Sequence, residues 1–124
     1  MKLLSQPLTM TLATIVCGAL CATLLIVPQL LAWLFQIELD HSGAIFARRA
    51  GMLFCGIAVI CWHSRALDPS PASRAIFLGL GTMMAGLALL GLVEFAQGRV
   101  GVGIFLAIVA EIAFSVHFLS FAKK

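Results

Sequence analysis

Charged side chains are scarce in this 124-residue chain. Eight Lys and Arg and five Asp and Glu make up 10% of the residues, whereas 62% are hydrophobic. Soluble domains carry about 25% charged and about 45–50% apolar residues. So few charges cannot cover a water-soluble core of this size, which excludes a soluble enzyme and a disordered segment. The chain also lacks a basic cluster, which excludes a nucleic-acid-binding domain. A small integral membrane protein remains, with residues 1–124 forming a single transmembrane domain.

Four apolar stretches are long enough to cross a bilayer as helices, which needs about 20 residues each. They cover residues 8–34, 45–62, 72–97 and 100–121. Pro28 lies near the end of the first stretch and predicts a kink there, because proline has no backbone N–H to donate. Ser70 followed by Pro71 is typical of a helix start. The predicted fold is all-α: an integral membrane four-helix bundle with short loops.

The Lys and Arg residues are unevenly divided between the two sides of the membrane. With four spans, both termini and the loop that precedes Pro71 share one side. That side carries Lys2, Arg65, Arg74, Lys123 and Lys124, and the opposite side carries Arg48, Arg49 and Arg99. Because positively charged residues favour the cytoplasmic side, we expect both termini in the cytoplasm. The first apolar stretch lacks an A-x-A cleavage site and is expected to be retained as a span.

Glu111 lies near the middle of the fourth span, about ten residues from either end. An ionised acid at that depth costs ~3 kcal/mol on insertion scales, so the residue needs a compensating environment. Gly103, Ala107 and Ser115 follow the same helix face at four-residue spacing. We therefore expect Glu111 to be protonated and to face protein, and we take Glu111 and Ser115 as candidates for handling a proton or a ligand. The alternative is a structural acid that is hydrogen-bonded to a neighbouring Ser, Thr or backbone carbonyl.

A second group of charges is expected near one membrane surface. Arg48 and Arg49 lie in the first turn of the second span, and Glu94 lies in the last turn of the third. These spans run in opposite directions, so the three side chains reach a similar depth. The sequence predicts a buried ion pair between Glu94 and one of the arginines. Two alternatives are separate snorkelling of each side chain and an anion site for a lipid phosphate.

The usual motifs of catalysis, metal binding and haem binding are absent. The cysteines form no C-x-x-C pair, and isolated thiols in apolar helices usually act as small hydrophobic side chains. His63 and His117 fall at different depths, whereas two haem ligands must face each other at one level. We predict no catalytic residue, no metal ligand and no cofactor.

One segment resembles a known pattern. It runs Phe46-Ala47-Arg48-Arg49-Ala50-Gly51-Met52-Leu53-Phe54-Cys55-Gly56 and is followed by Trp62 and by Ser73-Arg74-Ala75-Ile76. This pattern is similar to that of small bacterial four-span inner-membrane proteins of unknown function. The resemblance covers mainly the second span and the start of the third. It implies a bacterial inner-membrane location and no particular activity.

These observations favour a small polytopic inner-membrane protein that is not an enzyme. It would serve as an accessory or assembly subunit, or bind a lipid or another hydrophobic ligand. Its expected partners are the lipid bilayer and either a larger membrane complex or further copies of the chain, but no nucleic acid. Two alternatives stay open. One is a proton-coupled small transporter or channel that uses Glu111 and acts as a homo-oligomer, and the other is a membrane redox protein.

The orientation can be tested by cysteine labelling. We expect Ser70→Cys, in a background without the native cysteines, to be protected in intact cells from a reagent that cannot cross the membrane. The reason is the five-to-three distribution of Lys and Arg. Labelling of this position from outside intact cells would place the termini on the other side.

Overall fold

The structure is a computed structural model that describes residues 4–123, and within that range it is all-α with no strand. Its helices are α1 (Gln6–Ile26), α2 (Pro28–Phe35), α3 (His41–Ser64), α4 (Pro71–Ala96) and α5 (Ile104–Phe121). Four of them, all but the short α2, are long and apolar enough to cross a membrane. The prediction of an all-α bundle with four membrane-spanning helices is confirmed.

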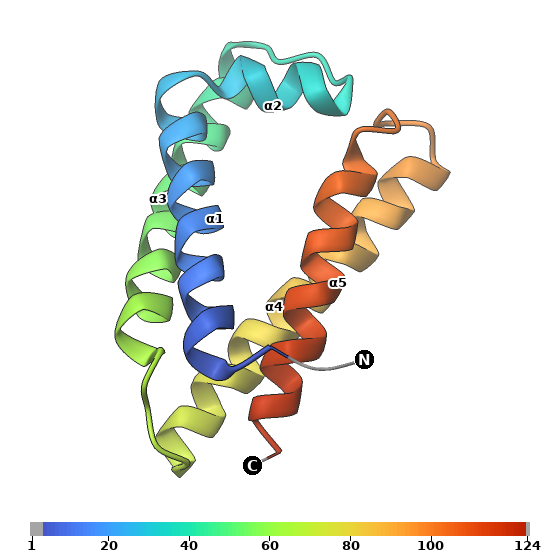
Figure 1. Cartoon of the computed structure of the whole chain (residues 1–124). Coiled ribbons are helices and arrows are strands. Elements are labelled where there is room, and N and C mark those ends of the chain that lie inside the picture. Colours follow the sequence, from blue (N-terminus) through green and yellow to red (C-terminus); the bar gives the residue numbers. More distant parts are fainter. Residues whose placement is uncertain (1–3, 124) are drawn as a thin grey trace.

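The first span is shorter than predicted, because the chain breaks into two helices at Val27. This residue has φ −136° and ψ 66°, outside the helical region, and Pro28 begins the next helix. Helix α2 does not continue along α1 but turns across one end of the molecule (Figure 1). The expected kink in residues 8–34 is therefore a complete break, and the first membrane-spanning helix is Gln6–Ile26.

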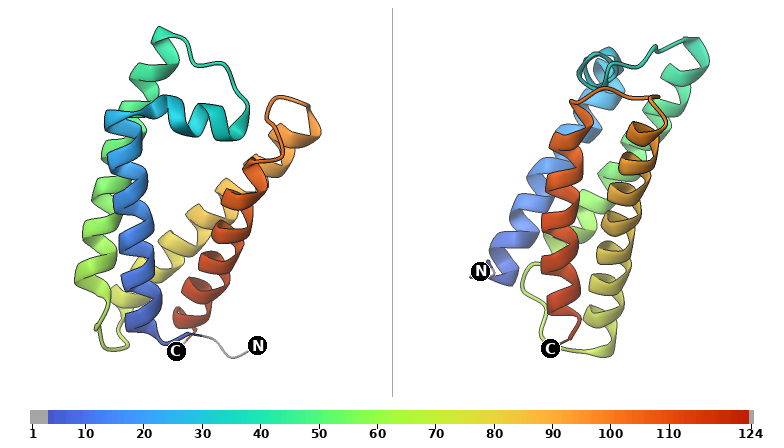
Figure 2. Two further views of the ribbon diagram at one scale, coloured as in Figure 1. Left: turned by 45° about the horizontal axis from the view of Figure 1, so that its top comes forward. Right: turned by 90° about the vertical axis from the view of Figure 1, so that its right-hand side faces the viewer.

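The four long helices form two antiparallel pairs, α1 with α3 and α4 with α5. The pairs meet at the end of the molecule that holds the α3–α4 loop, and they diverge toward the end that holds α2 (Figures 1 and 2). The main core lies where they meet. Its most buried members are Met10, Ala13, Cys17, Cys61, Phe77 and Phe118. We call this the closed end and the α2 end the open end.

Glycines allow the helices within each pair to approach closely. A Cβ atom on Gly51 of α3 would lie 3.1 Å from the Leu24 Cβ of α1, and one on Gly81 of α4 would lie 2.7 Å from the Leu119 side chain of α5. Small residues at such contacts are typical of membrane helices, because lipid provides no hydrophobic force to drive helices together. The glycines therefore set the spacing within the pairs.

Helix α2 bridges the open end. It begins directly after α1, and its far end rests on the loop between α4 and α5. There the Gly101 N–H donates a hydrogen bond of 2.7 Å to the Phe35 carbonyl oxygen. A Cβ atom on Gly103 would overlap the Leu34 carbonyl oxygen. Hence the bridge depends on two glycines that let backbone pack on backbone.

We predict that Gly103→Ala lowers the free energy of unfolding by ~1–3 kcal/mol, the usual cost of adding a methyl group where no space exists. The backbone of Gly103, with φ −59°, is compatible with alanine, so the effect is steric. Gly86→Ala is the control, because a Cβ atom there would meet nothing within 4 Å. In the interior of α4 this change is expected to be neutral or stabilising. Thermal unfolding in detergent measures both, and equal stability of the two variants would contradict the prediction.

Candidate functional site

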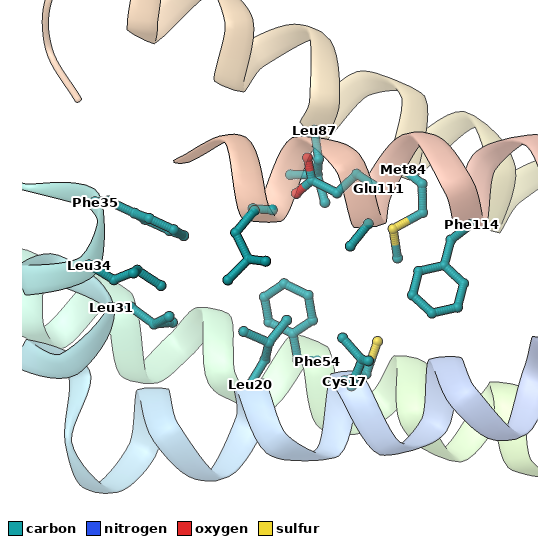
Figure 3. Close-up of a pocket in the computed structure, with 14 residues that line it drawn as sticks. Cys17, Leu20, Leu31, Leu34, Phe35, Phe54, Met84, Leu87, Glu111 and Phe114 are labelled. Carbon is teal, nitrogen blue, oxygen red and sulfur yellow. The ribbon is translucent and has the colours of Figure 1, made fainter. Parts of the chain in front are cut away.

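A cavity of about 200 Å³ lies between the two helix pairs and below α2. All five helices contribute to its wall (Figure 3). The wall is built from aliphatic, aromatic and sulfur-containing side chains, among them Leu20, Leu31, Phe35, Phe54, Met84 and Phe114. Such a wall offers van der Waals contact in every direction and almost no hydrogen bonding. The cavity suits an apolar ligand.

Among the described residues of this wall, Glu111 is the single Asp, Glu, Lys, Arg or His side chain. Its side chain extends from α5 into the wall that Leu87 of α4 also lines (Figure 3). Within residues 4–123, no hydrogen bond or ion pair reaches the Glu111 carboxylate. Glu111 is half-buried and lines the cavity, and the Ser, Thr or carbonyl partner expected for a structural acid is not seen among the described residues.

Ser115 is not part of the cavity, although it follows Glu111 by one helical turn. Its Oγ donates a hydrogen bond of 2.9 Å to the Gly81 carbonyl oxygen on α4, and the residue is only 6% exposed. Four residues advance a helix by slightly more than one turn, so Ser115 points into the α4–α5 contact while Glu111 faces the opening between the pairs. This hydrogen bond joins α4 to α5, and Ser115 does not line the cavity that Glu111 lines.

A second hollow of about 350 Å³ continues from the first. Glu111 and Ala107 line both spaces, and the second reaches Leu90, Gly91 and Glu94 along α4. Because the two hollows share part of their lining, they are neighbouring parts of one apolar region between the helix pairs. Glu111 belongs to the shared lining, and Glu94 lines only the second hollow.

Glu94 has a different ion-pair partner from the one predicted. Its carboxylate lies 3.3 Å from the Arg99 guanidinium, whose side chain is 64% exposed. Arg48 and Arg49 are exposed and form no ion pair with the described residues. The reason is that α3 and α4 diverge at the open end, so a shared depth does not bring their ends together (Figure 2).

A local signal for the observed pair exists in the turn after α4. Gly98 adopts φ 68°, and the Arg99 N–H donates to the Glu94 carbonyl oxygen at 3.0 Å. This is the pattern of a helix that ends with a left-handed glycine. It carries the chain back over the last turn, which places the Arg99 side chain beside Glu94. Gly98 directly before Arg99, four residues after Glu94, could have been used to predict the ion pair between Glu94 and Arg99.

His117 has a structural role that the sequence did not indicate. The residue is 8% exposed and its two ring nitrogens have partners on different segments. The Leu4 N–H donates to Nε2 at 3.2 Å, and Nδ1 lies 2.7 Å from the Ala113 carbonyl oxygen. Because Nε2 accepts, Nδ1 carries the proton. His117 thereby ties the segment before α1 to α5 at the closed end.

Comparison of the chain with protein-family models, with curated proteins and with solved structures finds no match. The chemistry of the site is therefore inferred from its own geometry. An apolar cavity of about 150 Å³ stays dry and binds benzene in another protein. The cavity here is larger and carries one carboxylate, so it can hold a ring-sized lipophilic group and one polar or charged atom.

We predict that the pair between Glu94 and Arg99 contributes less than about 1 kcal/mol, as solvent-exposed ion pairs usually do. A buried pair with Arg48 or Arg49 would instead lose ~3–5 kcal/mol when Glu94 is truncated. A double-mutant cycle with Glu94→Ala and Arg99→Ala in detergent measures the coupling, and the same cycle with Arg48→Ala is the control. Coupling to Arg48 that exceeds the coupling to Arg99 would refute this assignment.

Proposed function

We propose that this small polytopic membrane protein is a non-catalytic binding protein that holds a lipophilic small molecule between its two helix pairs. The observation that supports the proposal is the apolar cavity of about 200 Å³, to which all five helices contribute. Protein interiors are normally packed as densely as organic crystals, with few voids larger than a water molecule. We therefore interpret this space as a ligand-binding site.

The size of the space favours a ligand larger than a single ring. The first hollow accommodates a substituted ring, and the neighbouring hollow of about 350 Å³ offers further apolar surface toward the open end. Ligand sites in proteins are typically apolar clefts with a few polar groups that fix orientation. Glu111, which lines both hollows, is the group that would orient this ligand.

The route to the cavity is lateral, from the hydrocarbon of the bilayer. Helix α2 lies across the open end, and the core blocks the closed end (Figure 1). Between the pairs, in contrast, contacts are sparse: α1 touches α5 only slightly, and α3 diverges from α4. A ligand that is dissolved in the bilayer can reach the cavity there without crossing water, which suits a lipophilic molecule.

We also propose a bacterial inner-membrane location with cytoplasmic termini, on the basis of the Lys and Arg distribution. The start of α1, the end of α5 and the α3–α4 loop lie at one end of the molecule, as four spans require in either orientation (Figure 1). Helix α2 then lies near the periplasmic surface. Its Trp33 is 75% exposed, and tryptophan is enriched at membrane–water interfaces.

Binding can be tested with tert-butylbenzene, a neutral substituted ring. We expect one molecule to bind per chain in a non-ionic detergent, above the partition into empty micelles. Ala107→Phe should reduce the affinity at least about tenfold, because Ala107 lines both hollows and a phenyl ring there fills the space.

Ala85→Phe is the matched control, since it makes the same change on an exposed position of α4 that lines neither hollow. It should bind like the wild type. Flow dialysis with radiolabelled tert-butylbenzene measures the dissociation constants of both variants and of the wild type. Failure of the wild type to show saturable binding, or unchanged binding by Ala107→Phe, would refute the proposed function.

A further inference from the structure

We infer, resting on the proposed function, that the ligand is a lipophilic cation and that Glu111 is its counter-ion. The ligand class would be an apolar molecule with an ammonium or similar positively charged group. Three features of the cavity carry this inference: the sign of its charge, the unpaired state of Glu111 and the aromatic rings around it.

The charge that lines the cavity is of one sign. Neither hollow has a Lys, Arg or His in its wall, and the charged groups there are Glu111 and Glu94. Glu94 has a counter-ion, because Arg99 lies 3.3 Å away. Glu111 has none among residues 4–123. Charged groups within a membrane protein are normally paired or mark a ligand or ion path. A positively charged ligand completes the pair that the chain itself leaves open, whereas an anion would meet repulsion.

Aromatic rings supply a second, independent attraction for a cation. Phe35 of α2, Phe54 of α3 and Phe114 of α5 line the same cavity as Glu111 (Figure 3). The faces of aromatic rings attract cations through their quadrupole, and this attraction strengthens when water is excluded. Rings from three helices together with one carboxylate are a combination suited to binding an ammonium group.

The inference also fixes the sign of the pH dependence. A proton and the cation compete for the same carboxylate oxygens, so a protonated Glu111 must release its proton to solvent as the cation binds. The affinity for the cation should therefore decrease as the pH is lowered. The other titratable groups that line the space are Cys17 on α1 and Glu94 on α4; α2 and α3 contribute none to either wall.

Two isosteric probes separate charge from shape. Phenyltrimethylammonium and tert-butylbenzene differ only in one central atom, a positively charged nitrogen in place of a carbon. We expect both to bind the wild-type protein and to compete with each other. Glu111→Gln keeps the shape of the side chain and removes its charge. It should lower the affinity for phenyltrimethylammonium about tenfold or more and abolish its pH dependence, while tert-butylbenzene binds as before.

Retained binding of tert-butylbenzene shows that Glu111→Gln still folds. Glu38→Gln is the matched control, because it removes one negative charge from an exposed position in the loop after α2. It should leave the affinity for both probes unchanged. The inference is overturned if Glu111→Gln and the wild type bind the cation equally, or if the wild type binds only the neutral probe; in both cases the proposed function stands. If the wild type does not bind tert-butylbenzene, the proposed function fails, and the inference that rests on it fails as well.

Discussion

The arrangement of this molecule depends on the end of α1 at Val27–Pro28. Proline cannot donate a backbone hydrogen bond, and a membrane offers no water to replace one, so a helix can end at a proline only where the freed polar groups still find partners. It does so here: the Val27 N–H donates to the Thr23 carbonyl oxygen at 2.8 Å, and the Leu30 N–H donates to the Val27 carbonyl oxygen at 3.1 Å. With those groups satisfied, α2 can turn across the open end and meet the α4–α5 loop. The bridge it forms separates the two helix pairs, and the cavity is the space that results.

Glu111 and Ser115 show how one helix can serve two purposes. Both lie on the same side of α5, yet the small rotation between them directs Ser115 into the α4 contact and Glu111 into the cavity. A polar side chain in a membrane helix gains most when it has a partner, and Ser115 has one in the Gly81 carbonyl oxygen. Glu111 has none in the described chain, which is the costlier arrangement. Under the proposed function, a bound ligand would supply the partner that Glu111 does not find in the described chain.

The helices were predictable because hydrophobic length alone identifies membrane spans. The second, third and fourth spans fall within a few residues of α3, α4 and α5. The break at Val27 was not predictable, since proline kinks many membrane helices without ending them. Sequence also located Glu111 at mid-span on a face of small residues. The sequence could not reveal the cavity, because the volume of the cavity depends on the angle between two helix pairs that are distant in sequence.

The Glu94 prediction failed for a related reason. Counting residues from a helix end gives the depth of a side chain in the membrane but not its position within the plane of the membrane. Arg48, Arg49 and Glu94 share a depth, and the divergence of α3 and α4 keeps them apart. The turn at Gly98 was a local feature and therefore the more reliable guide.

The contacts between the two pairs are concentrated at the closed end, where the core and the bond from the Leu4 N–H to His117 lie. A rotation of one helix pair relative to the other would therefore be centred on the closed end. A rotation about a pivot displaces atoms in proportion to their distance from it. A rotation of a few degrees would leave the packed core nearly unchanged, and it would change the width of the cavity most beside α2. Under the proposed function, such a rotation would let the cavity take ligands of different width, and the backbone hydrogen bond between Gly101 and Phe35 would limit how far the helix pairs separate.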